Sequence, residues 1–389
     1  MKKIIAFLCI CILISVPVLD TIYASECYKV EKNKIIKNQQ SYYTSTRFKE
    51  KYTTLRVCKE RQESITKFPD NYAGMYINQE NELVVNFVTD NVNLLDKNID
   101  ENIVYHRVNY SLNYLENILN CISANMTFFS IKEVYIDEYA NKVVIQNGLN
   151  NNKDIENYLC EKISEFDTNA IQFMDVEGVK WTDAAGTKIN SIIDKKYCRG
   201  FTMGYNAHHT NMNRPGFVTC AHSISGVSDG VYRFGTSYRL GCVAKYQLGG
   251  KIDASFVLYD HPSNITSNSL TGAPITGTYA ASQITTGMIV YKYGLASQLQ
   301  SGKVISTNTA FKVNNIQFTD QIKVDIIQKE GDSGAPLVFN FIGPMQEGQI
   351  YIVNLLGIVT CSNTAGTIGY ASKAEYINSI LGITTYLIV

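Results

Sequence analysis

The stretch "QKEGDSGAPLV" (residues 328–338) places Gly-Asp-Ser-Gly directly before an apolar run near the C-terminal end of the chain. Glycines around a short polar residue are common in ordinary turns. The same layout also suits a serine held for nucleophilic attack, Ser333, provided that the chain supplies a base and an acid to orient that base. The rest of the sequence therefore has to decide between a turn and a catalytic site.

A candidate base follows the apolar run "GFVTCA" (residues 216–221), where the end of a strand can hold a side chain rigidly. That residue is His222. The histidines at positions 208 and 209 lie in a polar loop, and the histidine at position 261 precedes a proline. We therefore favour His222 over these three as the base.

A candidate acid opens the β-prone run "DASFVLYD" (residues 253–260). A carboxylate at the head of a buried strand is costly unless it is paired, and an imidazole N–H is one partner that would satisfy it. We therefore expect Asp253 to orient His222. Four other acids occupy turn or strand-edge contexts that favour solvated or capping roles: Asp229, Asp260, Asp320 and Asp325.

The residues around Ser333 indicate how an oxyanion would be bound. Gly331 allows a sharp bend that presents its N–H beside the N–H of Ser333, and two such donors form an oxyanion hole. Gly334 is expected to leave space for substrate. Asp332 would point away from the reacting face and needs an internal cation as its partner.

From residue 196 onward, short β-prone runs alternate with Gly, Asn and Ser turns, which predicts an all-β barrel or sandwich. Within this region the motifs "GFVTCAHS", "DASFVLYD" and "GDSGAPLV" follow one another in the order His, Asp, Ser. The region resembles the chymotrypsin-like serine peptidases, in the compact bacterial branch of the streptogrisins and α-lytic protease. The resemblance implies a double β-barrel over residues 196–389, with His222, Asp253 and Ser333 as base, orienting acid and nucleophile. The α/β-hydrolases and subtilisins use other chain orders.

The resemblance also assigns supporting residues. Lys292 in "VYKYG" is expected to pair with Asp332, although it could equally be a solvated strand lysine. The strand "GIVTCSN" (residues 357–363) corresponds to the strand that lines the substrate channel and supports the triad acid, which implies substrate contacts at Thr360, Cys361 and Ser362.

Specificity is predicted from the residues just before the nucleophile. By the resemblance, Ile327 corresponds to the base of the primary pocket, with Gln328 and Glu330 at its rim. An apolar base argues against a preference for Lys or Arg, because no carboxylate awaits the cation, and favours a medium-sized apolar side chain.

The upstream region, residues 71–175, predicts a small α+β domain. We expect strands at residues 75–77 and 83–88, a helix over residues 112–122, a hairpin with strands at 134–136 and 143–145, and a second helix beginning near Asp154. The stretches "AGMYINQENELVVNFVTD" and "VYIDEYANKVVI" resemble the pro-region of the same peptidases, which implies that this domain assists folding and blocks the site until it is removed. Residues 176–195 are a connector and the expected processing region.

The chain begins with two lysines, an apolar run and small residues near position 24, as in a secretory signal peptide; a membrane anchor is the alternative. Residues 25–70 form a polar lead-in. Removing the two cysteines of residues 1–24 leaves eight of the ten, and an even number in an exported chain favours disulfides. Ser223 stands where the family has a cysteine, which leaves Cys220 and Cys242 as alternative partners of Cys198.

Composition excludes several other classes of protein. Basic and acidic residues number 35 each, so no net charge favours nucleic acid or an acidic membrane. No cysteine or histidine cluster predicts a metal, and no cofactor is expected. The sequence thus predicts a secreted, monomeric serine endopeptidase that acts on polypeptides and is made as a pro-enzyme with its pro-domain as chaperone and inhibitor. The alternative is an inactive homologue that acts as a secreted binding protein. A secreted esterase is disfavoured by the triad order and by the lack of a Gly-x-Ser-x-Gly motif.

Overall fold

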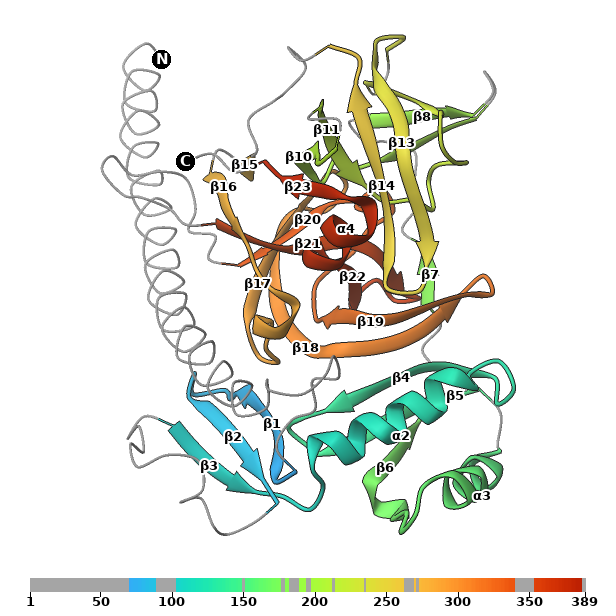
Figure 1. Cartoon of the computed structure of the whole chain (residues 1–389), viewed down its shortest axis with the longest axis vertical. Coiled ribbons are helices and arrows are strands. Elements are labelled where there is room, and N and C mark those ends of the chain that lie inside the picture. Colours follow the sequence, from blue (N-terminus) through green and yellow to red (C-terminus); the bar gives the residue numbers. More distant parts are fainter. Residues whose placement is uncertain are drawn as a thin grey trace, which may run out of the picture.

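The protein is described by a computed structural model over residues 70–88, 103–148, 151–175, 179–181, 189–193, 197–211, 214–233, 236–261, 269–270, 273–339 and 353–386. The expected signal peptide and all of the polar lead-in except residue 70 lie outside these residues. The described chain forms an N-terminal unit, residues 70–175, and a C-terminal unit, residues 189–386. In Figure 1 the N-terminal unit lies below the C-terminal unit.

The N-terminal unit is α+β. Its first sheet contains β1 (Tyr72–Ile77), β2 (Leu83–Phe87) and β3 (Ile103–Arg107), with β1–β2 antiparallel and β2–β3 parallel. Its second part is the antiparallel hairpin of β4 (Ile131–Asp137) and β5 (Lys142–Asn147), extended by the parallel strand β6 (Ile171–Met174). Two helices, α2 (Leu112–Ala124) and α3 (Asn152–Lys162), complete it, with a short 3-10 turn η2 (Thr168–Ala170) before β6.

Helix α2 shows how the sequence pattern builds this unit. The Ser111 side chain caps it by accepting the Tyr114 N–H at 3.2 Å. Apolar residues at helical spacing, among them Leu115 and Ile118, are fully buried and join the strand residues Val134 and Ile145 in one core cluster. The predicted strands, helix and hairpin are therefore found, with ends that differ by a few residues.

The C-terminal unit begins with an eight-stranded sheet in the order β23-β10-β11-β14-β13-β12-β8-β9. All its pairings are antiparallel, and its apolar core includes Phe217, Val231 and Val257. The strands are β8 (Ile189–Ile193), β9 (Tyr197–Phe201), β10 (Tyr205–His209), β11 (Arg214–Thr219), β12 (Gly230–Arg233), β13 (Arg239–Gly249), β14 (Ile252–Tyr259) and β23 (Ile383–Thr385).

A second sheet closes on itself. Its strands pair antiparallel in the ring β17-β18-β19-β22-β21-β20 and back to β17, around a core that includes Val290, Ile322 and Leu337. The ring strands are β17 (Ile289–Gly294), β18 (Gln298–Val313), β19 (Ile316–Val324), β20 (Pro336–Phe339), β21 (Val353–Asn363) and β22 (Gly369–Lys373). Around it lie β15 (Ser269–Leu270), β16 (Ala273–Thr278), η4 (Ala281–Gln283) and the terminal helix α4 (Ala374–Leu381).

The two units are joined by strand pairing. Beyond the ring, β18 continues as an edge that pairs antiparallel with β4, so that one sheet passes from the C-terminal unit into the N-terminal unit (Figure 1). A short connector strand, β7 (Val179–Trp181), pairs with the outer end of β21. The double β-barrel expected from the sequence is thus confirmed for the C-terminal unit, but this unit starts earlier than residue 196, because β8 pairs with β9 and β12.

The expected disulfides are wrong for four cysteines, since Cys121, Cys160, Cys242 and Cys361 are free thiols. An even count shows that pairing is arithmetically possible, but not that the residues meet. Cys220 is packed in the core of the first sheet with its sulfur 3.4 Å from the Ser223 hydroxyl, and Cys361 is buried in another cluster. The cysteines at positions 27 and 58 and the side chain of Cys198 lie outside the described residues.

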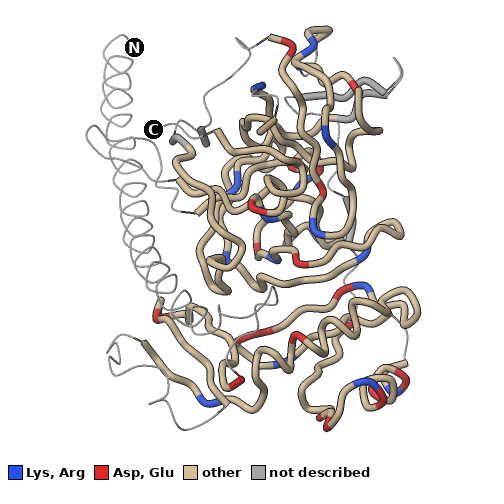
Figure 2. Tube along the Cα trace, in the orientation of Figure 1, with Lys and Arg blue, Asp and Glu red and all other residues tan. Residues whose placement is uncertain are grey.

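None of the helices among the described residues is long and apolar enough to cross a bilayer, and no group of three or more His, Cys, Asp and Glu side chains among these residues could hold a metal ion. Acidic and basic residues are interspersed along the described trace in Figure 2.

Candidate active site

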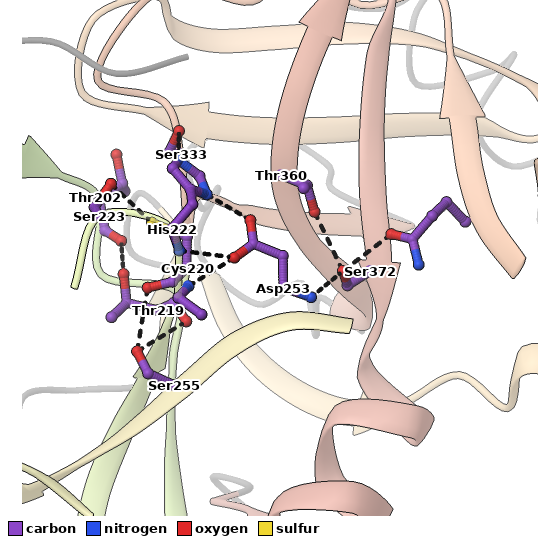
Figure 3. A network of polar contacts seen from close by, with 12 residues as sticks. Thr202, Thr219, Cys220, His222, Ser223, Asp253, Ser255, Ser333, Thr360 and Ser372 are labelled. Atoms are coloured by element: carbon purple, nitrogen blue, oxygen red, sulfur yellow. Dashed lines mark hydrogen bonds and ion pairs between the residues drawn. The ribbon is translucent and has the colours of Figure 1, made fainter. Parts of the chain in front are cut away.

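The structure brings His222, Asp253 and Ser333 together from three separate segments of the chain (Figure 3). Nε2 of His222 lies 2.9 Å from Oγ of Ser333, and Nδ1 lies 2.5 Å from Oδ2 of Asp253. His222 is 8% exposed, and the other two residues are completely buried. A hydroxyl, an imidazole and a carboxylate in this order can pass a proton from the serine to the imidazole.

Asp253 is fixed on the buried strand β14, as the sequence suggested. Its second oxygen, Oδ1, accepts the backbone N–H groups of Ala221 and His222 at 2.8 and 3.0 Å. Because the same backbone that carries the imidazole also binds the carboxylate, the two side chains are held in one orientation. The buried charge is compensated by three donors rather than one.

A network of hydrogen bonds behind Asp253, which no sequence motif indicates, anchors the main chain of this residue. The Asp253 N–H donates to Oγ of Ser372 at 2.9 Å, and this hydroxyl donates in turn to Gln321 at 3.0 Å (Figure 3). Thr360 lies 3.2 Å from the same Ser372 oxygen. Thr360 therefore supports the acid through Ser372, an intermediary on β22 that no motif marks.

The loop before Ser333 is shaped by bonds to Thr202, a second residue that sequence reasoning missed. The Thr202 hydroxyl donates to the Gly331 carbonyl at 2.7 Å, and the Thr202 N–H donates to the Ser333 carbonyl at 2.8 Å. The Ala335 N–H binds the Asp332 carbonyl at 2.9 Å, which fixes the peptide plane that carries the Ser333 N–H. These bonds pin the backbone from which oxyanion donors would come.

Gly334 has a role other than the expected one. Its φ is +84°, and an added Cβ would lie 2.3 Å from the Thr202 carbonyl oxygen and 2.6 Å from the Thr219 hydroxyl. Glycine is required here because the protein's own backbone approaches closely, rather than because a substrate needs the space.

Lys292 and Asp332 form an ion pair whose side chains are both fully shielded from solvent. The ammonium group also donates to Ser297 and Gln328, each at 3.0 Å. The carboxylate accepts the N–H groups of Ala296, Ser297 and Lys329. Burial would raise the pKa of Asp332, but the attraction of Lys292 and these hydrogen bonds outweigh it, so the pKa lies below its usual value.

The residues expected to set specificity do not lie as predicted. Ile327 is 51% exposed, whereas the floor of an enclosed pocket would be shielded, and Glu330 is also exposed. Gln328 is instead turned inward and is 4% exposed. On the neighbouring strand β21, Thr360, Cys361 and Ser362 are completely buried.

The strand expected to line the substrate channel carries a segment of the chain itself. In the antiparallel register Asn363 faces Val179, Ser362 faces Lys180 and Cys361 faces Trp181. The connector thus occupies the edge of β21 as an extra strand, in the manner of an extended peptide added to a sheet. It runs toward Ser333, because Val359, farther back along β21, exchanges backbone hydrogen bonds with Gly334 and Ala335.

The other candidates are engaged elsewhere. Asp229 accepts two backbone N–H groups of its own loop, and Asp260 pairs with Arg239. Asp320 pairs with Lys251 and Lys373. Among the acids considered in the sequence, Asp253 is the one that meets a histidine.

Comparison with known proteins gives structural likenesses at low identity. No family model matches the chain, and no curated protein matches it. Among solved structures, a Nocardiopsis protease is 18% identical over 51% of this chain and 97% of its own, with a TM-score of 0.39. Thermobifida fusca protease A is 18% identical over 52% and 97%, with a TM-score of 0.39. A serine protease described as specific for glutamic acid is 19% identical over 51% and 98%, with a TM-score of 0.40. The C-terminal unit resembles the bacterial chymotrypsin-like serine proteases in its fold.

Proposed function

We propose that the protein is a serine endopeptidase that hydrolyses peptide bonds through an acyl-enzyme intermediate, with Ser333 as nucleophile, His222 as general base and Asp253 as the residue that orients the base. The observation that carries the proposal is the continuous contact from Ser333 Oγ through the imidazole to Asp253. In the first step Ser333 Oγ attacks the carbonyl carbon while His222 takes its proton, and the imidazolium then protonates the leaving amine. Water repeats the sequence and releases the acid.

The oxyanion that forms during each attack would be bound by the N–H groups of Gly331 and Ser333. Gly331 has a φ of +99°, and its loop is held by Thr202. Asp332 supports the same turn from beneath through Lys292. Each oxyanion donor typically contributes about 3 kcal/mol to the barrier reduction, so a fixed loop is part of the machinery.

We further propose that the chain is a secreted pro-enzyme whose N-terminal unit is removed. Three contacts support this: β4 pairs with β18, Glu133 of the N-terminal unit lies 2.8 Å from Lys323 of the C-terminal unit, and β7 covers the edge of β21 where a peptide substrate would bind. Because β8 belongs to the C-terminal unit, processing is expected between residues 181 and 189. The N-terminal unit would act as inhibitor and folding aid in the meantime.

The test is to express the full chain, Ser333→Ala and Ser225→Ala, the last being an exposed serine near the base. Wild type and Ser225→Ala should shorten to a fragment that begins between residues 182 and 189 and should cleave a denatured protein substrate. Ser333→Ala should remain full-length and inactive. A Ser333→Ala chain that still cleaves substrate would refute the proposed nucleophile, and a full-length wild type that is active without processing would refute the pro-enzyme.

A further inference from the structure

Two buried polar atoms beside the candidate active site have no hydrogen-bond partner among the described residues. They are Nε2 of Gln328 and Oγ of Ser362. Gln328 is 4% exposed and Ser362 is completely buried. A buried polar group without a partner costs roughly 1–3 kcal/mol, so two of them close to a reactive centre call for an explanation.

The orientation of the Gln328 amide is fixed by Lys292. The ammonium group of Lys292 can only donate, and it lies 3.0 Å from the Gln328 side chain, so Oε1 must face it. The other end, the NH₂ group, is thereby directed away from the ion pair and toward Gly369 at the start of β22. A Cβ on Gly369 would lie only 2.2 Å from Nε2. The amide thus fills the space that a side chain at position 369 would take.

Ser362 faces the same space. It lies directly opposite Gly369 in the antiparallel pairing of β21 and β22. Side chains of directly opposed residues point to the same face of a sheet, so the Ser362 hydroxyl and the Gln328 amide lie on one side of Gly369. Both atoms belong to segments next to Ser333, one on the strand that β7 covers and the other five residues before the nucleophile.

The residues around Gln328, Ser362 and Gly369 exclude several kinds of substrate side chain. Among the described residues, Asp332 is already paired with Lys292 and is not available to a lysine or arginine of the substrate. For the same reason Lys292 is not available to a substrate carboxylate, which would be buried at a cost against an amide and a hydroxyl. A long side chain would collide with Gln328, which occupies the space beside Gly369. A short, uncharged side chain with a hydroxyl would satisfy both orphan atoms.

We propose that Gln328 and Ser362 form a small polar primary pocket that selects threonine, and less strongly serine, at the residue whose carbonyl is attacked. The inference rests on the proposed peptidase function and names its substrate class. It replaces the medium-sized apolar preference expected from Ile327, which is exposed.

The test uses the processed wild-type protein and peptides that differ only in the residue before the cleaved bond. Threonine and valine have nearly the same shape and differ by a hydroxyl, so their ratio of kcat/KM reports the hydrogen bonds alone. We expect threonine to be favoured at least tenfold over valine, because a pocket built to bind a hydroxyl is left with unpaired groups by valine. Lysine should be a poor substrate.

Ser362→Ala should bring the threonine-to-valine ratio close to one while a fluorophosphonate probe still labels the protein. Thr384→Ala, an exposed position on β23, is the matched control and should keep the wild-type ratio. Equal cleavage of threonine and valine peptides by the wild type would overturn the pocket, and this outcome needs no variant to fold. Failure of the fluorophosphonate probe to label the wild-type protein would instead refute the peptidase function itself.

Discussion

Two buried ion pairs of this molecule can be compared, one beside Ser333 and one between the two units. Asp332 pairs with Lys292 and also accepts three backbone N–H groups, all from the C-terminal unit. Glu133 of the N-terminal unit lies 2.8 Å from Lys323, whose ammonium group also sits 3.9 Å from the ring centre of Tyr135. The Glu133 carboxylate thus contacts a side chain of the C-terminal unit, while the main chain of the same residue is paired with Phe311 of β18.

The difference suggests what each pair is for. A carboxylate bound by the backbone of its own unit is a permanent part of that unit. Removing this carboxylate leaves the partner lysine buried without a counter-charge. A carboxylate bound across a boundary can be released together with its unit, after which the partner lysine regains water. The first pair is therefore expected to hold the site and the second to hold the two units together.

The largest effect is expected from Asp332→Asn. The substitution leaves Lys292 buried without its counter-charge, so the free energy of unfolding should fall by about 3–5 kcal/mol. The fall in the free energy of unfolding is measured by denaturant unfolding of chains that also carry Ser333→Ala, because these chains are expected to remain uncleaved. Asp260→Asn, which removes a surface pair with the half-exposed Arg239, is the control and should cost no more than about 1 kcal/mol. Equal losses in the two variants would contradict the distinction.

A smaller effect is expected from Glu133→Gln in the same background. Loss of the charge across the boundary should lower the stability of the joined units by about 2 kcal/mol, the range for hydrogen bonds to charged groups. Glu156→Gln, in an exposed pair with Lys153 of the N-terminal unit, serves as the control. With Ser333 intact, Glu133→Gln should also speed processing while leaving the processed enzyme unchanged, since position 133 is then gone. A less stable processed enzyme would show that the comparison is wrong.

The response of stability to pH should differ in sign between the two regions. At the boundary, burial raises the pKa of Glu138, which lies beside Thr286, to about 7. Its joined-state pKa lies above its unfolded value, so the joined state binds more protons and should lose stability as pH rises from about 4.5 to about 7. The pKa of Asp332 is lowered, so its contribution is present above about pH 4 and is lost in acid.

Thermal unfolding of the Ser333→Ala chain across this range tests the sign. Glu138→Gln should flatten the decline between about pH 5 and about pH 7 and leave the acid transition in place. If the thermal stability of the Glu138→Gln chain falls with pH as steeply as that of the Ser333→Ala chain, Glu138 is not the cause of the decline.

The sequence predicted which three residues meet in the candidate active site, because each stands in a motif with its own local reason. It also predicted the double barrel and the α+β unit, since strand and helix periodicities are strong there. It did not reveal Thr202, Ser372 or Gln321, because these residues come to the site through tertiary pairing and their local sequence is ordinary.

Two further expectations failed for physical reasons. The segment before Ser333 is an irregular loop, so no periodicity tells which of Ile327 and Gln328 points inward. The cysteine count likewise carries no information on distance, and the thiols of Cys121, Cys160, Cys242 and Cys361 are free. The pairing of β7 with β21 was not predicted either, because a short polar segment carries no pattern that shows which strand it will pair with.

The most direct test of the central claim is to locate the reactive residue. Processed wild-type protein treated with a fluorophosphonate, then digested and analysed by tandem mass spectrometry, should carry one adduct, on Oγ of Ser333. The adduct should disappear in His222→Ala, because the hydroxyl then has no base. An adduct on another residue, or undiminished labelling of Ser333 without His222, would contradict the account.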